Sequence, residues 1–229
     1  MKFGIIGAMD EEIELLKATM TEAKEITIAN AQFIEGKLEN QQVILVKSGI
    51  GKVNAAMTTA ILMENFQPDY VVNTGSAGGF DEHLAVGDVV ISQEVVHHDV
   101  DVTAFDYAYG QVPELPPRFA ADLRLVDETA AALSTLQLPY KKGLIATGDS
   151  FLSNPDRVET IKETFPEMLA GEMEAAAIAQ VCYQYKVPFV VIRALSDIAG
   201  KSSEVSFDVF LETAAKNAAN MILTVLRQA

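Results

Sequence analysis

One stretch near the C-terminus constrains the fold more than any other part of the sequence. It covers residues 168–200 and reads MLAGEMEAAAIAQVCYQYKVPFVVIRALSDIAG. Its composition predicts a short strand, an alanine-rich helix over 174–185, and a buried strand that starts at Pro188. Small side chains let a helix lie close to a sheet, and an unbroken β-branched run is typical of a parallel strand covered on both faces. Strand, helix and strand of this length predict a right-handed crossover, with both C-terminal strand ends at the same sheet edge.

Ionisable residues gather at that predicted edge. Glu172 and Glu174 follow the first strand, and Arg193, Ser196 and Asp197 end the second. Ligands bind at this edge in open parallel sheets, and charged groups brought together there are costly unless they are used. The stretch therefore predicts a polar ligand site.

Length and charge narrow the class of protein. The 229 residues, half of them apolar, predict a single α/β domain spanning 1–229 with a sizeable core. The single cysteine, Cys182, indicates a reduced, cytoplasmic setting. No apolar run approaches membrane-spanning length, and the first residues suit a strand rather than a signal peptide. A formal charge of −15 argues against nucleic acid and anionic membranes as partners.

Other elements follow from apolar periodicity and turn residues. Strands are predicted at 3–7, 33–38, 43–46, 70–72, 86–100 and 142–148, and helices at 10–20, 53–65, 120–135 and 207–227. We expect Asn154 to cap a helix that starts at Pro155. A loop over 101–118 carries several aromatic residues and prolines, and a loop of this length inside a compact domain is usually functional. Its aromatics predict an interface with a partner chain.

Three short motifs lack the features of a phosphate-binding loop, a dinucleotide-binding turn and a metal site. The glycines around Ile50 lack the spacing of a phosphate-binding loop, because Val53 stands where a serine or threonine is needed. Gly4 and Gly7 have the wrong spacing for a dinucleotide fingerprint. His97 and His98 form the only histidine pair, and without a third ligand at a suitable spacing we expect no metal site.

Five polar segments each follow a predicted strand. In isolation each has an ordinary structural explanation: Glu174 could cap its helix, Asp197 could cap a loop, Phe151 and Phe207 could belong to the core, and the glycines after Thr74 could form a plain turn. Together they predict one pocket at one sheet edge. The segments are 9–12, 75–78, 148–151, 171–174 and 196–197.

The same segments carry a resemblance that spans the whole chain. GIIGAMDEE, NTGSAGG, ATGDSF, GEMEAAAIAQ and RALSD resemble, in order and spacing, the 5′-methylthioadenosine/S-adenosylhomocysteine nucleosidases of the nucleoside phosphorylase/hydrolase superfamily. Asp10 departs from the glutamate of many members. The resemblance implies a three-layer αβα sandwich around a mixed, partly barrel-like sheet, assembled as a homodimer. It implies no cofactor and no metal.

The resemblance also implies roles for individual residues. Glu12 matches the residue that activates the attacking water, and Asp197 matches the acid that protonates N7 of the leaving adenine. Other matched positions bind substrate: Glu174 and Met173 at the ribose, Phe151 and the backbone of Leu152 at the purine, Ser76, Gly78, Arg193 and Ser196 as polar and backbone supports, Met9, Ile50 and Phe207 near the 5′ substituent, and Val102, Phe105 and Pro113 from the partner subunit.

Three functions compete. The first is hydrolysis of methylthioadenosine, adenosylhomocysteine and 5′-deoxyadenosine to adenine and the corresponding sugar, which would serve methionine salvage and removal of methyl-cycle by-products. A phosphorylase is disfavoured because Asn73 replaces the arginine of related phosphorylases and residues 10–12 are acidic. A non-catalytic purine-binding protein is disfavoured because Glu12 and Asp197 are both present. Aminofutalosine remains an open alternative substrate.

Overall fold

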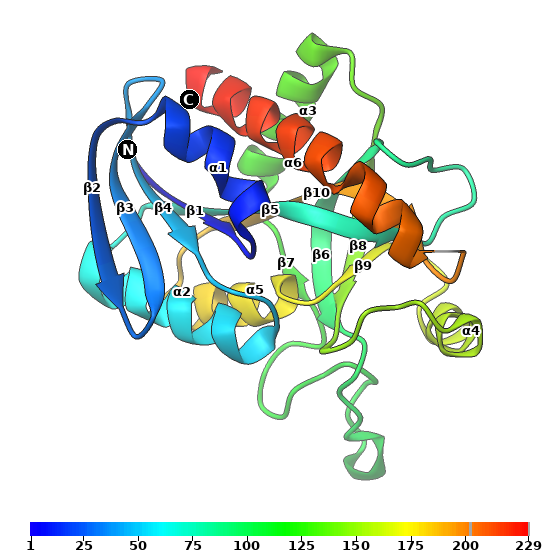
Figure 1. The fold of residues 1–229 in the computed structure, drawn as a ribbon. Coiled ribbons are helices and arrows are strands. Elements are labelled where there is room, and N and C mark those ends of the chain that lie inside the picture. Colours follow the sequence, from blue (N-terminus) through cyan, green and yellow to red (C-terminus); the bar gives the residue numbers. More distant parts are fainter. Residues whose placement is uncertain (202, 229) are drawn as a thin grey trace.

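The structure, a computed structural model, describes residues 1–201 and 203–228, with 203–206 and 208 described only as parts of a helix. A single mixed sheet runs through it in the order β10-β6-β8-β9-β5-β1-β4-β3-β2 (Figure 1). A short strand, β7, pairs with β6. The strands are β1 (Lys2–Gly7), β2 (Thr21–Ile28), β3 (Ala31–Leu38), β4 (Gln41–Lys47), β5 (Tyr70–Gly79), β6 (Val89–His97), β7 (Phe119–Ala120), β8 (Tyr140–Thr147), β9 (Met168–Glu172) and β10 (Phe189–Ile198).

The sheet closes on itself at one end. β10 pairs with β6 and also with β5, so that β10, β6, β8, β9 and β5 form a ring. From β5 the sheet continues outward as an open arm through β1, β4, β3 and β2. This arrangement confirms the predicted mixed, partly barrel-like sheet.

Helices cover the sheet on both sides, as Figure 1 shows. One layer holds α1 (Asp10–Thr19), α3 (Leu123–Leu136) and α6 (Ser203–Gln228), which pack together. The opposite layer holds α2 (Lys52–Phe66) and α5 (Ala175–Tyr185). A shorter helix, α4 (Pro155–Thr164), packs at the ring end, where Val158 and Ile161 meet Leu144 and Met168. The predicted three-layer αβα fold is confirmed, and no helix in the described residues is long and apolar enough to cross a membrane.

Local sequence explains why these elements form. The alanines of α5 are completely or almost completely buried, which lets the helix lie against the sheet and α2, while Val190, Val191 and Ile192 of β10 are buried between the two helix layers. The predicted cap of α4 is confirmed, since Asn154 accepts hydrogen bonds from the backbone N–H groups of Asp156 and Arg157.

The predicted parallel pairing around α5 is wrong. β10 runs parallel to β5, whereas β9 runs antiparallel to it, with Gly78 opposite Gly171. The ring causes this reversal, because β9 reaches β5 by way of β8 and β6 rather than from the β10 side. The C-terminal ends of β5, β9 and β10 nevertheless meet, because the antiparallel pairs lie at the ends of β5 and β9.

The predicted glycine-rich turn after residue 72 is also wrong. β5 continues to Gly79, and Gly78 is the register partner of Asp197. A Cβ added to Gly78 would lie 3.2 Å from Asp197 Oδ2, so the absence of a side chain lets the Asp197 carboxyl lie directly over the strand. The glycines therefore serve close packing within a sheet rather than a reversal of the chain.

Two element boundaries and one whole strand also differ from the predictions. β6 is shorter than the predicted strand, because Gly87, with φ +95°, forms a turn before it. α6 begins at Ser203 rather than at 207. β2 was not predicted; it is a largely exposed edge strand in which charged residues hide the β-pattern.

Candidate active site

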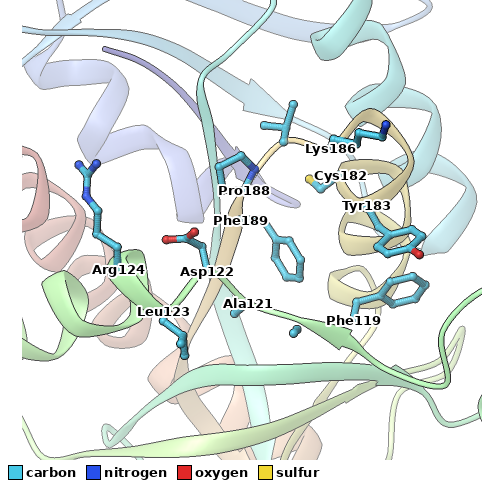
Figure 2. A pocket seen from close by; sticks show the side chains of 12 residues that line it. Phe119, Ala121, Asp122, Leu123, Arg124, Cys182, Tyr183, Lys186, Pro188 and Phe189 are labelled. Atoms are coloured by element: carbon cyan, nitrogen blue, oxygen red, sulfur yellow. The ribbon is translucent and has the colours of Figure 1, made fainter.

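Two hollows differ in their chemistry. The larger, about 580 Å³, lies between β7, the start of α3 and the end of α5 (Figure 2). Two of its charged side chains have local roles: Asp122 caps α3 by accepting from the Leu125 N–H, and Arg124 pairs with Glu128. It also lies beside Phe189, at the opposite end of β10 from Asp197.

The smaller cavity, about 280 Å³, lies where the predicted polar segments meet. It is bordered by the ends of β5, β9 and β10, the start of α1, and the loops before α2 and after β8. Four carboxylates face it among mostly apolar walls, and such a combination of few polar groups and apolar surface is typical of a small-molecule site. Its lining residues are Ala8, Met9, Glu12, Ile50, Ser76, Ala77, Gly78, Phe151, Gly171, Glu172, Met173, Glu174, Ser196, Asp197 and Phe207.

Glu12 is buried and held by four hydrogen bonds. Its Oε2 accepts from the N–H groups of Ala8, at 2.7 Å, and Met9, at 3.2 Å. Its Oε1 accepts from the Ser76 N–H at 2.9 Å and the Ser76 hydroxyl at 3.2 Å. The first pair belongs to the N-terminal turn of α1, where the helix dipole favours an anion. Because every partner donates, the arrangement suits an ionised carboxylate that can accept a proton.

Glu12 and Arg193 both lie close to the bare backbone of Gly75. A Cβ placed on Gly75 would lie 2.7 Å from Glu12 Oε1 and 2.9 Å from Arg193 Nη1. The absence of a side chain at this position therefore lets both polar groups approach the strand.

Asp197 lies on the ring side of the cavity. Its side chain is buried, and the Ser196 hydroxyl donates to Oδ1 at 2.9 Å. β10 shifts register between Leu195 and Asp197, which directs consecutive polar residues toward the cavity end of the strand.

Arg193 lies behind the cavity wall and is 2% exposed. Its Nη2 donates to Glu172 Oε2 at 2.5 Å and to Asn73 Oδ1 at 2.8 Å, and lies 3.8 Å from Glu174 Oε2. Buried charges require such partners. One guanidinium thus faces two carboxylates at close range.

Burial raises the pKa of Glu174, and the carboxylates around Arg193, which outnumber its single positive charge, raise it further. Burial, and then the charge of Glu172, raises the pKa of Glu174 to about 8, although Arg193 and the Gly51 N–H, which donates to Oε1 at 2.8 Å, favour its ionised form. Glu12 adds to the repulsion. The raised pKa therefore favours the protonated form of Glu174 at neutral pH.

This proton gives a testable pH dependence of stability. Between the usual carboxyl pKa of 4.5 and the folded value of about 8, the folded protein holds a proton that the unfolded chain has lost, so stability falls as the pH rises through this window. Glu174→Gln removes the titration. We expect the variant to gain several degrees in Tm relative to wild type between pH 6 and pH 9, since about 1 kcal/mol shifts Tm by roughly 2–4 °C at this size. The Tm values are measured by calorimetry. A difference in Tm between variant and wild type that stays constant across that range would contradict the raised pKa of Glu174.

The structure brings most of the predicted site residues together. Eleven line the cavity, among them Phe207 from α6, which packs edge-on against Phe151 with ring centroids 5.7 Å apart. Arg193 is close by but behind Glu172 and Glu174, and Leu152 is buried in the core beside Gly171. Val102, Phe105 and Pro113 do not line the cavity of their own chain.

Four lining residues had no individual role in the prediction, although three of them lie in the predicted pocket segments 75–78 and 171–174. Ala8, Ala77 and Gly171 are small residues that shape the walls and leave no chemical signature in the sequence. Glu172 is different, because it stands next to Met173 and Glu174 and was recognised only as a charge at a strand end. The hydrogen bonds that make it part of the site come from elements far apart in the sequence.

The histidine pair has separate surroundings. His97 Nε2 lies 3.1 Å from Gln180 Oε1, while the ring of His98 packs over Gly148. Burial lowers the pKa of both imidazoles. Within the described residues no three histidine, cysteine or acidic side chains are grouped so that they could hold a metal.

Known proteins resemble this chain in both sequence and fold. The family model described as the phosphorylase superfamily matches residues 2–227. The 5′-methylthioadenosine/S-adenosylhomocysteine nucleosidase of a Geobacillus species is 60% identical over 229 residues, covering 99% of this chain and 98% of the relative. The nucleosidase of Neisseria meningitidis in complex with methylthio-immucillin-A superposes with a TM-score of 0.98 at 48% identity, covering 100% of this chain and 99% of that one. That of Colwellia psychrerythraea, in complex with adenine, gives 0.96 at 51% identity, with 100% and 95% covered.

In each of these three comparisons the similarity extends over nearly the full length of this chain and of the related chain. The chain therefore belongs to the phosphorylase superfamily and, within it, to the family of 5′-methylthioadenosine/S-adenosylhomocysteine nucleosidases.

Proposed function

We propose that the cavity hydrolyses the N-glycosidic bond of 5′-methylthioadenosine, S-adenosylhomocysteine and 5′-deoxyadenosine, releasing adenine and the corresponding 5-substituted ribose. The observation that carries this proposal is the presence of Glu12, Glu174 and Asp197 in one cavity of nucleoside size. The bound adenine and the methylthio inhibitor of the two structural relatives support the substrate class.

Asp197 acts as the general acid. Departure of adenine as an anion is unfavourable, so protonation at N7 must accompany cleavage of the bond. A buried aspartate beside a serine hydroxyl, packed against the bare backbone of Gly78, can reach the edge of a planar base. Paired carboxyl groups in different environments perform comparable acid and base roles in other glycoside-cleaving enzymes.

Glu12 acts as the general base toward water. Glu12 lines the cavity and its four hydrogen-bond partners are all donors, so its carboxylate can accept a further hydrogen bond from a water that enters the cavity. While the oxocarbenium-like sugar develops, the negative charge of Glu12 stabilises the cation, and Glu12 then takes a proton from the water as its oxygen bonds to C1′. Ser76 holds Glu12 in place through both its N–H and its hydroxyl.

Glu174 binds the 2′- and 3′-hydroxyls of the ribose, and Met173 packs against the sugar. A carboxylate accepts hydrogen bonds from both hydroxyls, whereas its protonated form cannot do so fully. Binding of the diol therefore competes with protonation of Glu174. Phe151 and Phe207 provide aromatic surface for the purine and the 5′ substituent.

Water rather than phosphate is the nucleophile. Asn73, which stands where related phosphorylases carry arginine, is buried and already bonded: its Nδ2 donates to Ile6 O at 2.9 Å and its Oδ1 accepts from Arg193. Arg193 is itself engaged by carboxylates. A phosphate near Glu12 would meet more negative than positive charge.

The deciding experiment incubates the enzyme with methylthioadenosine, with and without phosphate. We expect adenine to be released at the same rate in both, with free methylthioribose as the second product. Phosphate-dependent release with a ribose-1-phosphate product would identify a phosphorylase, and binding without release would identify a purine-binding protein.

Apolar walls favour a thioether at the 5′ position. Met9, Ile50 and Phe207 offer no side-chain partner to a free 5′-hydroxyl. We expect kcat/KM for methylthioadenosine to exceed that for adenosine by about 10-fold or more, the range that one unpartnered or mismatched group contributes in an apolar pocket. Equal kcat/KM for the two nucleosides would show that the apolar walls do not select for a 5′-thioether.

A homodimer completes the pocket in this proposal. Phe105, at 75% exposure, and Val53, at 78%, are large apolar side chains on the surface, and the loop that carries Phe105 extends away from the sheet in Figure 1 (green, below the body). Exposed aromatic surface of this kind favours an interface. Sedimentation at micromolar concentration should give twice the chain mass. In such a dimer, Val102, Phe105 and Pro113 would cover the neighbour's 5′ site, in an enzyme of the cytoplasm.

A further inference from the structure

Glu172 lines the cavity, and its carboxylate is held by four hydrogen bonds from within the protein. Its Oε2 accepts from the N–H groups of Glu174, at 3.0 Å, and Ala175, at 2.8 Å, and from Arg193 Nη2 at 2.5 Å. Its Oε1 accepts from the Thr147 hydroxyl. Three of these four donors converge on Oε2 and one reaches Oε1, so the carboxylate is tied mainly to the start of α5 and to Arg193.

Thr147 extends this arrangement by one residue. Its Oγ1 accepts from the Ala176 N–H at 2.9 Å. Three successive backbone N–H groups at the start of α5 are therefore bound by Glu172 or by the hydroxyl attached to it. These are the amides that a helix leaves unsatisfied at its N-terminus. Glu172 thereby fixes the backbone from which the Glu174 side chain projects.

The same oxygen holds the guanidinium. Arg193 Nη2 meets Glu172 Oε2 at 2.5 Å but lies 3.8 Å from Glu174 Oε2. Glu172 is thus the close anionic partner of Arg193, which leaves Glu174 as the carboxyl that can turn to a ligand. Without Glu172, Glu174 would be the nearest carboxylate and would be drawn to the buried charge.

We propose that Glu172 is a positioning residue for ribose recognition: it caps α5, takes up Arg193 as an ion-pair partner, and so keeps Glu174 available for the sugar diol. This inference rests on the proposed role of Glu174. The charged groups that face Glu174 are Glu172 from β9, Arg193 from β10 and Glu12 from α1, with the Gly51 N–H before α2.

Three variants separate charge from geometry. Glu172→Gln keeps the shape and an acceptor for the α5 amides but removes the charge. Glu172→Asp keeps the charge but is too short to reach all of its donors. Thr147→Val removes one hydrogen bond and leaves the Glu172 charge in place. The readouts are KM and kcat for methylthioadenosine, and the infrared titration of the buried carboxyl in the substrate-free protein, assigned by its loss in Glu174→Gln.

We expect Glu172→Gln to shift the Glu174 titration toward acid by about one pH unit or more, since a like charge is removed and Glu174 becomes the partner of Arg193. KM should rise about 10-fold, with a smaller change in kcat. Glu172→Asp should raise KM while the titration stays within about half a unit of wild type, and Thr147→Val should leave the titration unchanged.

A folded Glu172→Gln protein with wild-type KM and an unshifted titration would overturn the proposal. If that variant does not fold, wild-type KM in Glu172→Asp would overturn it equally. The titration needs no substrate, so its outcome is separate from the proposed reaction: a wild-type enzyme that releases no adenine would refute the function, while a shifted Glu174 titration would still establish the electrostatic coupling.

Discussion

Asp197→Asn is expected to lose nearly all turnover and to keep its affinity for adenine-containing ligands. Asparagine can accept the hydrogen bond from the Ser196 hydroxyl and can donate one to N7, so the bound geometry is retained. It cannot release a proton to the leaving base. Loss of a general acid costs about 10²–10⁴-fold in rate, and a larger loss would mean that adenine departs only when protonated by this residue. Single-turnover release of adenine and equilibrium binding of a thioether inhibitor measure the two quantities separately.

Asp156→Asn is the matched control, because it makes the same chemical change at an exposed carboxylate on α4, and its kcat should equal that of wild type. Undiminished turnover in Asp197→Asn would remove Asp197 from the mechanism. Loss of binding together with turnover would instead assign it to the binding of the base.

Glu12→Gln is expected to lower kcat by about 10²–10⁴-fold, the usual contribution of a general base. It should also lower stability, because all four partners of Glu12 donate and an amide NH₂ cannot accept from them. One unsatisfied buried donor costs about 1–3 kcal/mol, which corresponds to a Tm loss of several degrees. Adenine release and a thermal melt on the same preparation test both effects.

Glu11→Gln provides the comparison on the neighbouring position, where the side chain is exposed and outside the cavity. It should match wild type in kcat and Tm. If Glu12→Gln kept its rate, water would be activated without this carboxylate, and the proposed division of roles between Glu12 and Asp197 would fail.

The segments around the cavity could be predicted because each polar cluster lies at or just after the C-terminal end of a strand. Glu12, Glu174 and Asp197 all face one cavity, as the strand-end argument and the family resemblance imply. The wrong pairing of β9 did not disturb this, because the antiparallel pairs lie at the C-terminal ends of both β5 and β9.

Other features could not be predicted from local sequence. The glycines of β5 look like a turn, and only the nearby Asp197 and Leu195 side chains explain why a strand needs them there. β2 carries exposed charges, so its pairing with β3 leaves little periodic signal. The role of Glu172 depends on Thr147 and Arg193, which reach it from two other strands.

Three of the pocket's four carboxylates accept hydrogen bonds from main-chain amides: Ala8, Met9 and Ser76 hold Glu12, Glu174 and Ala175 hold Glu172, and Gly51 holds Glu174. Their positions thus depend largely on where the strand and helix ends lie. The apolar side chains of the lining, such as Ile50 and Phe207, do not hold these carboxylates in place. Substitutions in the apolar lining can therefore change which nucleoside binds without moving the carboxylates that cleave it.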